Sequence, residues 1–231
     1  MKIFTYIKNN SSRVNKKNFQ KIDGLELWKI LLYELNEIGC EVFIDTDSQE
    51  VIDECSKDRS LQNTTAYFRK KKFIDMENDS TNTLSPANLM FENFLDNYVS
   101  DNNETIVLTH VTSPFLKKET VLNAVKIHKT GKYDYIHSVN IERDFGFLGG
   151  FDNPINFNPN VIQRTQDLTP IYFSNGAFFI MNKRVFKENQ NRWGKNIHFY
   201  PLSPVEGVEI DYYEDLEIAK IIKRGLRNEK N

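Results

Sequence analysis

Hydrophobic residues recur along the chain in two patterns: short apolar runs, and longer stretches with a period near 3.6 residues. Residues 2–7 (KIFTYI) form the first apolar run, and residues 25–38 follow with the periodicity of an amphipathic helix. Residues 41–44 form a second run, and residues 48–57 a second helix. This strand–loop–helix–strand order predicts a parallel sheet with right-handed crossovers.

The same patterns continue to the C-terminal part of the chain. We predict further helices over residues 87–99, 118–129, 182–189 and 215–224, and strands over 105–109, 135–139, 177–181, 197–201 and 208–211. Residues 58–85 show little periodicity and are expected to form a long loop. Residues 145–163 are rich in Gly, Pro, Asn and Phe and are expected to leave the sheet as an excursion. The sequence therefore predicts one α/β domain over residues 1–231.

Four polar segments follow predicted strands. They cover residues 8–18, 45–48, 110–114 and 211–213. In open α/β sheets, ligands bind beyond the carboxyl ends of the strands. The convergence of these segments predicts a binding site at that edge.

Composition and charge narrow the function classes. The chain is 39% hydrophobic and 27% charged, as in an ordinary globular domain. Its formal net charge of −2 gives no reason to expect nucleic acid or an anionic membrane as the main partner. No apolar run approaches the ~20 residues of a membrane span. The two cysteines, Cys40 and Cys55, have no metal-ligand pattern around them, so we expect a reduced, cytoplasmic protein.

The stretch GVEIDYYEDLEIA, residues 207–219, carries the clearest candidate chemistry. In an extended segment, Glu209 and Asp211 point to the same side. Two carboxylates on one face are suitable oxygen ligands for Mg²⁺. The alternative is that these acids are solvated surface residues.

Four motifs resemble those of the acylneuraminate cytidylyltransferases, also called CMP-sialic acid synthetases. They are IDTDSQEV (44–51), VTSPFL (111–116), RTQDLTPIYFSNGAFFI (164–180) and EIDYYEDLEIA (209–219), in the family's order. The resemblance implies a Rossmann-like nucleotidyltransferase fold, a mostly parallel sheet flanked by helices. It also implies transfer of CMP from CTP to the anomeric hydroxyl of a nine-carbon 2-keto acid sugar, with release of pyrophosphate. Family members are commonly homodimers, and an excursion at about 142–170 would reach into the partner.

The resemblance also assigns roles to individual residues. Mg²⁺ would be held by Glu209 and Asp211, and Arg13 and Lys17 would act with Asp211 in catalysis by neutralising phosphate charge. The other nucleotide-binding candidates are Ser12, Asn18, Arg69 and Asn82. The candidates for binding the acceptor sugar are His110, Thr112, Ser113, Arg164, Gln166, Tyr172, Asn175 and Gly176. Arg164 is the candidate ligand of the sugar carboxylate, because a guanidinium can bind a carboxylate with two hydrogen bonds.

Two other functions stay open from the sequence. Asp45-Thr46-Asp47 follows a predicted strand and matches the metal-binding pattern of many glycosyltransferases, which would make the protein a user of nucleotide sugars. A non-catalytic, nucleotidyltransferase-like binding protein is the third possibility, because residues 7–18 lack the paired glycines usual in the family's first loop. Only a synthetase releases pyrophosphate from CTP in the presence of a free acidic sugar.

Overall fold

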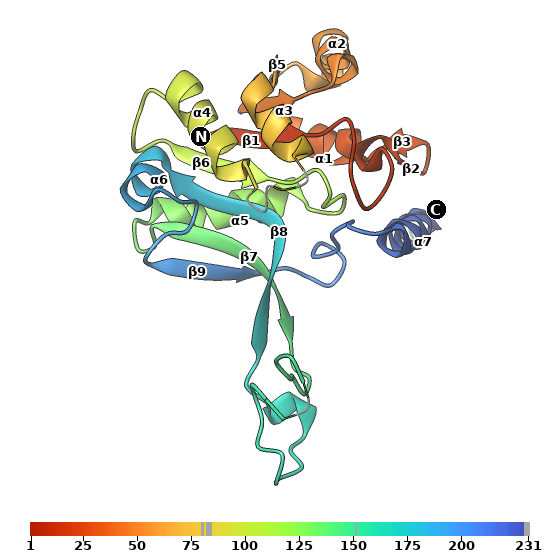
Figure 1. Cartoon of the computed structure of the whole chain (residues 1–231), viewed down its shortest axis with the longest axis vertical. Helices are drawn as coiled ribbons and strands as arrows, with labels where there is room; N and C mark the ends of the chain where they lie inside the picture. Colours follow the sequence, from red (N-terminus) through yellow and green to blue (C-terminus); the bar gives the residue numbers. More distant parts are fainter. Residues whose placement is uncertain (80, 82–84, 151, 229–231) are drawn as a thin grey trace.

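A seven-stranded sheet forms the centre of the protein, which we describe from a computed structural model covering residues 1–79, 81, 85–150 and 152–228. The strand order is β5-β4-β1-β6-β8-β7-β9 (Figure 1). The strands are β1 (Lys2–Ile7), β4 (Glu41–Thr46), β5 (Thr64–Phe68), β6 (Thr105–Thr109), β7 (Tyr135–Glu142), β8 (Ile171–Asn182) and β9 (Ile197–Pro201). Only β8 runs antiparallel to its neighbours in this sheet. The predicted mostly parallel α/β sheet is confirmed.

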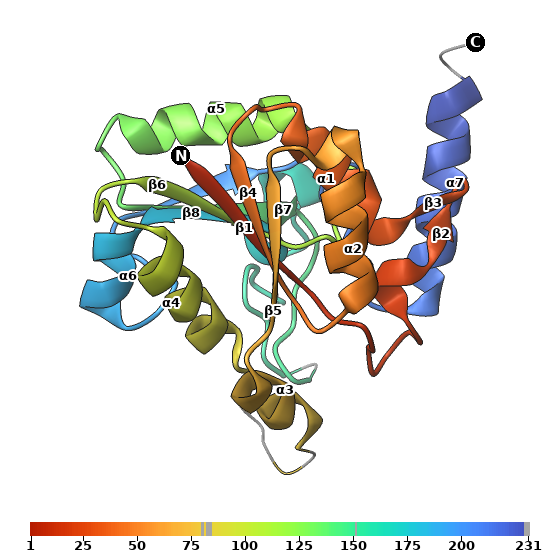
Figure 2. The ribbon, with the colours of Figure 1, turned by 90° about the horizontal axis from the view of Figure 1, so that it is seen from above.

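Helices cover both faces of the sheet (Figure 2). One layer contains α1 (Leu27–Asn36), α2 (Gln49–Lys57) and α5 (Lys118–Lys129), and the other contains α3 (Lys71–Asn78), α4 (Ala87–Tyr98) and α6 (Lys183–Asn189). The last helix, α7 (Tyr213–Asn228), packs beside a small hairpin of β2 (Lys21–Ile22) and β3 (Leu25–Glu26). No helix in the described ranges is long and apolar enough to cross a membrane.

The alternation of side chains along β1 explains the two cores. Ile3 packs with Leu31 of α1, whereas the next residue, Phe4, faces the other layer. There the Phe4 ring stacks on Phe94 of α4, with ring centroids 4.6 Å apart. All four side chains are fully buried, and burying each one stabilises the fold by roughly 1.5–3 kcal/mol. β1 is thereby fixed at the centre of the sheet, with its carboxyl end at the predicted binding edge.

An extended arm, residues 143–170, leaves the sheet between β7 and β8 (Figure 1). The outer halves of these two strands continue their antiparallel pairing as far as Glu142 and Ile171. Beyond them, the arm contains a short bridge between Phe147 and Pro154 and one 3-10 turn, Thr165–Asp167. The predicted excursion is therefore present, and the described part of it projects away from the rest of the chain.

Two predictions about secondary structure were wrong. Within the expected loop 58–85, the structure forms β5 and α3. The segment 208–211, predicted as a closing strand, belongs to no sheet in the described structure. Instead, the backbone N–H of Gly207 donates to Ser203 in a turn, and the N–H of Ile210 donates to the carbonyl of Thr112, 2.9 Å away. This irregular segment leads directly into α7.

Candidate active site

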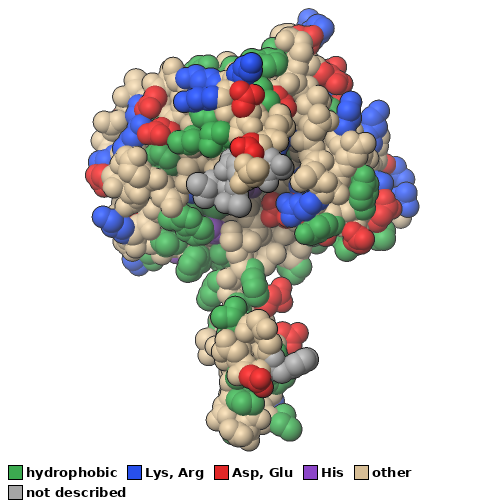
Figure 3. Space-filling view, in the orientation of Figure 1, with side chains coloured by type: hydrophobic (Ala, Val, Ile, Leu, Met, Phe, Trp, Pro, Cys, Tyr) green, Lys and Arg blue, Asp and Glu red, His purple; other side chains and the backbone are tan. Residues whose placement is uncertain are grey.

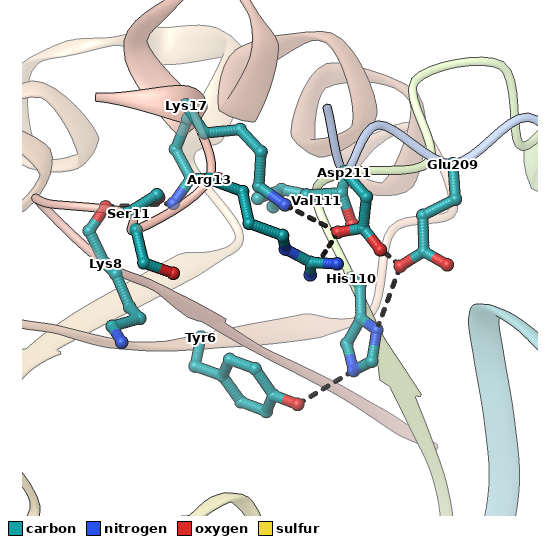
Figure 4. Close-up of a pocket in the computed structure, with 12 residues that line it drawn as sticks. Tyr6, Lys8, Ser11, Arg13, Lys17, His110, Val111, Glu209 and Asp211 are labelled. Atoms are coloured by element: carbon teal, nitrogen blue, oxygen red, sulfur yellow. Dashed lines mark hydrogen bonds and ion pairs between the residues drawn. The ribbon is translucent and has the colours of Figure 1, made fainter. Parts of the chain in front are cut away.

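A pocket of about 310 Å³ lies where β1 and β6 end. Its walls come from the loop after β1, the turn after β6 and the segment before α7. The lining residues are Tyr6, Lys8, Ser11, Ser12, Arg13, Lys17, Asn18, His110, Val111, Thr112, Glu209 and Asp211 (Figure 4). Three of the four predicted polar segments thus meet in one pocket, and residues 45–48 do not take part in its lining.

Two cations meet one carboxylate at one end of the pocket. The Asp211 Oδ1 atom accepts hydrogen bonds from Arg13 Nη2 at 2.6 Å and from Lys17 Nζ at 3.0 Å. Lys17 also donates to the backbone carbonyl of Ile210, at 2.8 Å. A hydrogen bond with the side chain of Tyr212, followed by the charge of Asp211, raises the pKa of Arg13. Both side chains are therefore held at the pocket wall by Asp211.

The segment before α7 is held in place by the helix it precedes. The Asp215 carboxylate accepts hydrogen bonds from the backbone N–H groups of Asp211, at 2.9 Å, and Tyr212, at 2.8 Å. An acidic side chain in the first turn of a helix is also favoured by the helix dipole. Asp215 thus positions the backbone that presents Asp211 to the pocket.

Glu209 lies beside Asp211 on the same wall (Figure 4). Its Oε1 atom accepts a hydrogen bond of 3.3 Å from Thr112 and lies 3.9 Å from His110 Nδ1. The other ring nitrogen of His110 is hydrogen bonded to the Tyr6 hydroxyl, at 2.8 Å. The predicted pairing of Glu209 with Asp211 therefore exists, although the strand expected to produce it does not.

The carboxylate oxygens in the pocket suit a hard divalent cation that takes its remaining ligands from a bound substrate. The described residues include no group of three or more His, Cys, Asp and Glu side chains that could hold a metal alone. Glu209 and Asp211 nevertheless face one pocket and could supply one oxygen each. Mg²⁺ commonly binds through one or two carboxylates, with phosphate oxygens and water as its other ligands. The residues present fit such a site.

Three predicted residues support the pocket, and of these only Asn18 also lines it. Asn18, itself 5% exposed, donates from its side chain to the Lys8 carbonyl and closes the first loop. Ser113 is buried in the turn after β6, where its backbone N–H donates to the His110 carbonyl. The Asn175 side chain is buried and bonds to Ser138 and Asn140.

The other candidates for binding the sugar lie on or next to the arm. Arg164 is exposed and forms an ion pair with Asp167, at 2.6 Å. Gln166 lies in the arm's 3-10 turn, and Tyr172 follows on the outer half of β8, stacked on Phe199. Within one chain, the structure does not bring these three residues to the pocket, so their predicted roles would require a second subunit.

The structure gives Arg69 a different position from the one expected. Its side chain is completely buried, with Nε 2.5 Å from Asp45 Oδ1 and Nη1 2.7 Å from Glu77. It also donates to the backbone carbonyls of Ile7 and Asp45, beneath the first loop. Arg69 is therefore a structural residue and does not line the pocket. Asn82, the remaining nucleotide-binding candidate, lies outside the described residues.

The same contacts weaken the glycosyltransferase hypothesis. Asp45 is completely buried against Arg69, and burial raises the pKa of its carboxyl group, opposed by the guanidinium charge. The Asp47 carboxylate accepts a hydrogen bond from the backbone N–H of Asn9, at 2.6 Å. Asp45 is thus not exposed to hold a metal with a nucleotide sugar.

Sequence reasoning missed four residues of the pocket: Tyr6, Lys8, Ser11 and Val111. Tyr6 belongs to the first apolar run, and its hydroxyl reaches the pocket because the strand ends one residue later. Lys8 and Ser11 lie in the predicted polar loop, ahead of Arg13 and Lys17, which match the family better. A hydroxyl or ammonium group immediately after a buried strand is the signal that could have identified them.

Comparisons with known proteins identify the family of the chain. A cytidylyltransferase family profile matches residues 8–222. N-acylneuraminate cytidylyltransferase from Streptococcus agalactiae serotype III is 24% identical over 181 residues, 76% of this chain and 40% of that protein. The Danio rerio N-acylneuraminate cytidylyltransferase A is 23% identical over 91% of this chain and 47% of its own. The chain thus spans less than half the length of these two relatives.

A shorter relative and two solved structures match along most of their length. CMP-N,N'-diacetyllegionaminic acid synthase from Legionella pneumophila is 23% identical, over 87% of this chain and 86% of its own. A CTP complex of CMP:2-keto-3-deoxy-manno-octonic acid synthetase has a TM-score of 0.64 at 11% identity, covering 96% of this chain and 98% of its own. The 4-diphosphocytidyl-2C-methyl-D-erythritol synthase of Anaerococcus prevotii has the same TM-score and identity, covering 96% of each chain. These structures show the nucleotidyltransferase fold, and the profile match shows that the chain belongs to the cytidylyltransferase family.

Proposed function

We propose that the protein transfers CMP from CTP to the anomeric hydroxyl of a sialic acid-like 2-keto acid sugar, with Mg²⁺ as cofactor. The observation that carries this proposal is the meeting of Arg13 and Lys17 with Glu209 and Asp211 in one pocket at the carboxyl end of β1. The two cations can offset the negative charge of the triphosphate, and the two carboxylates can bind the metal ion that accompanies the nucleotide. The curated relatives named above act on acylneuraminate or diacetyllegionaminate, as their names state, which supports an acidic sugar as acceptor.

The reaction is a displacement at the α-phosphorus of CTP. A bond forms between the anomeric oxygen of the sugar and this phosphorus, and the bond between the α-phosphorus and its bridging oxygen breaks. Pyrophosphate leaves with the bonding electron pair, and the proton of the sugar hydroxyl passes to water. When bound, Mg²⁺ would supply charge stabilisation at the phosphate oxygens.

Arg13 and Lys17 would change partners when the nucleotide binds. Without ligand, both pair with Asp211 Oδ1. A bound metal ion would take up the negative charge of Asp211, which leaves both side chains free to turn to the triphosphate. The Arg13 side chain is about half exposed and stacks over Tyr212, with its guanidinium carbon 5.2 Å from the ring centroid, so it has room for this rearrangement.

The assembly belongs to the proposal as well. The arm carries apolar side chains that are unusually exposed, among them Leu148 at 65% and Ile162 at 99% (Figure 3). Such side chains favour burial against a partner, and we assign a second copy of this chain, so that Arg164, Gln166 and Tyr172 approach the neighbouring pocket. Deleting residues 145–163 should produce a monomer or an insoluble chain. A wild-type protein that sediments as a monomer at micromolar concentration would refute this assembly.

We place the reaction in the cytoplasm. Both cysteines are free: Cys55 is buried, and Cys40 is half-buried. Reduced cysteines are the usual state in that compartment.

Nucleotide choice can be tested by thermal unfolding. A ligand that binds only the native state raises the midpoint. With Mg²⁺ present, CTP should raise it more than ATP, GTP or UTP. A larger shift with UTP or a nucleotide sugar would favour the glycosyltransferase alternative.

A further inference from the structure

Arg192 carries a buried nitrogen without a partner. Its Nη1 atom is shielded from solvent and makes no hydrogen bond in the described structure, where no ion pair involves Arg192 either. Leaving a buried charged donor unsatisfied costs at least as much as an ordinary lost hydrogen bond. Arg192 as a whole is only half-buried, so a guanidinium with one such unpaired nitrogen is a candidate for binding an anion.

The loop between α6 and β9 holds Arg192 in this position. α6 ends at Asn189, and the next residue, Gln190, adopts a left-handed conformation with φ of 51° and turns the chain. Asn191 then accepts a hydrogen bond from Asn88 of α4, at 3.1 Å. On the other side of Arg192, Trp193 stacks on His137, with ring centroids 4.8 Å apart. The contacts of Asn191 and Trp193 with α4 and β7 therefore fix the backbone on both sides of Arg192.

Arg192 does not line the pocket itself but lies behind two of its aromatic neighbours, Phe179 and Tyr6. Its guanidinium carbon lies 4.9 Å from the ring centroid of Phe179, whose ring packs against His110, at 5.7 Å. Burial raises the pKa of Tyr6, whereas the charge of Arg192 and a hydrogen bond from its side chain lower it, so the guanidinium lies against the Tyr6 hydroxyl and its Nη1 atom is the nitrogen left without a partner. Arg13 and Lys17, by contrast, gather at Asp211 (Figure 4).

The size of the pocket shows why a ligand should extend toward Arg192. A volume of about 310 Å³ is at the lower end for ligand sites, which measure roughly 300–1,000 Å³. CTP and a nine-carbon sugar together must extend beyond it. The triphosphate is drawn to Arg13 and Lys17, which leaves the Tyr6–His110 end for the sugar. Arg164, which lies in the arm, could reach this pocket only from a second subunit, whereas Arg192 belongs to the same subunit as the pocket.

We propose that Arg192 binds the carboxylate of the acceptor sugar and so selects acidic sugars. This inference rests on the proposed function, because it takes an acidic sugar as the acceptor. Phe179 beneath the guanidinium would fix its plane, and a carboxylate could accept from Nη1. Arg192 would act as a binding and specificity residue, with no part in the bond-forming step.

The test compares an acid with its uncharged ester. Wild type, Arg192→Gln and Arg184→Gln are titrated calorimetrically with N-acetylneuraminate, N,N'-diacetyllegionaminate, 2-keto-3-deoxy-manno-octonate and the methyl ester of each. Arg184, on α6, is about half exposed and paired with Glu188, so its variant controls for loss of a nearby charge. Each protein is also titrated with CTP and Mg²⁺, and pyrophosphate release is measured.

We expect wild type to bind at least one acid about tenfold or more tightly than its ester, as for a charge-assisted hydrogen bond. Arg192→Gln should lose that preference, keep its affinity for the ester and bind CTP within about twofold of wild type. The inference is overturned if the variant keeps the preference, if CTP affinity falls as much as acid affinity, or if wild type binds none of the acids. Acid-selective binding without pyrophosphate release would instead count against the proposed transfer while leaving the role of Arg192 intact.

Discussion

The carboxylate of Glu209 occupies the space that a side chain at Gly176 would need. A Cβ atom on Gly176 would lie 3.0 Å from Glu209 Oε1 and 3.0 Å from His110 Nδ1, closer than nearly all such contacts in proteins. Gly176 also has a φ of +69°, which other residues rarely adopt. The glycine therefore lets the acid and the imidazole approach the β8 backbone.

This relationship predicts the effect of Gly176→Ala. The variant should lose about 1–2 kcal/mol of stability from its backbone conformation. Pyrophosphate release should fall about tenfold or more, because Glu209 is displaced. Gly149→Ala is the matched control, since Gly149 has a φ of +73° and no atom within 4 Å of the added Cβ. Equal activity in the two variants would contradict the role given to Gly176.

Asp211→Asn should preserve the fold but reduce turnover by about 10²-fold or more, as expected for loss of a main charge stabiliser. The amide keeps the shape of the side chain but cannot offset the charge of Mg²⁺. Glu209→Asp should have a milder effect, because the carboxylate remains. Glu217→Gln, at an exposed residue paired with Lys220, is the control. If Asp211→Asn retains near wild-type turnover with the same Mg²⁺ dependence, the metal site lies elsewhere.

Sequence reasoning located this site better than it described the local structure. The order of strands placed residues 8–18, 110–114 and 211–213 at one edge of the sheet, where parallel strands end. The family resemblance then singled out Arg13 and Lys17 and gave the acidic pair its metal-binding role. Sequence reasoning failed at segment 208–211, where the apolar–acidic alternation resembles a strand but the backbone bonds to Thr112 instead. Contacts over such distances leave no periodic signal in the sequence.

The elements missed in residues 58–85 have a related explanation. β5 is an edge strand, and none of its five residues is buried, so no apolar run marks it. Arg69 was assigned to the nucleotide from the family resemblance alone. Its ion-pair partners Asp45 and Glu77 lie 24 and 8 residues away, and no sequence pattern connects them to it. Arg192, a single cation in a polar loop, gave no signal at all.

Breaking the buried ion pair between Arg69 and Asp45 should strongly lower the stability of the fold. Arg69→Met leaves the Asp45 carboxylate without its main partner and should lower the free energy of unfolding by about 3–5 kcal/mol. The double variant Arg69→Met with Asp45→Leu should cost clearly less than the sum of the single variants. Urea unfolding of all four proteins completes the cycle. Additive losses would show that the pair is not coupled.

His137 should make stability depend on pH. Burial, followed by the charge of Arg192, lowers its pKa from 6.5 to about 4. Between these values the unfolded chain binds the proton and the folded chain does not, so the free energy of unfolding falls as the pH is lowered from 6.5 toward 4. At pH 5 the loss relative to pH 7 should be about 2 kcal/mol from this group.

His137→Gln tests this dependence. The variant should show a shallower fall in the free energy of unfolding between pH 7 and pH 5, whatever its absolute stability. Some dependence should remain, because burial also lowers the pKa of His128. An unchanged slope in the variant would contradict the assignment to His137.

The proposed activity is tested most directly by pyrophosphate release. The protein is incubated with Mg²⁺, each of the four nucleoside triphosphates and each acidic sugar named above, with neutral N-acetylmannosamine as the control acceptor. We expect pyrophosphate only from CTP with an acidic 2-keto sugar, in equal amount to the CMP-sugar formed. No release from CTP with any of these acids, or equal release without a sugar, would contradict the proposed transfer of CMP.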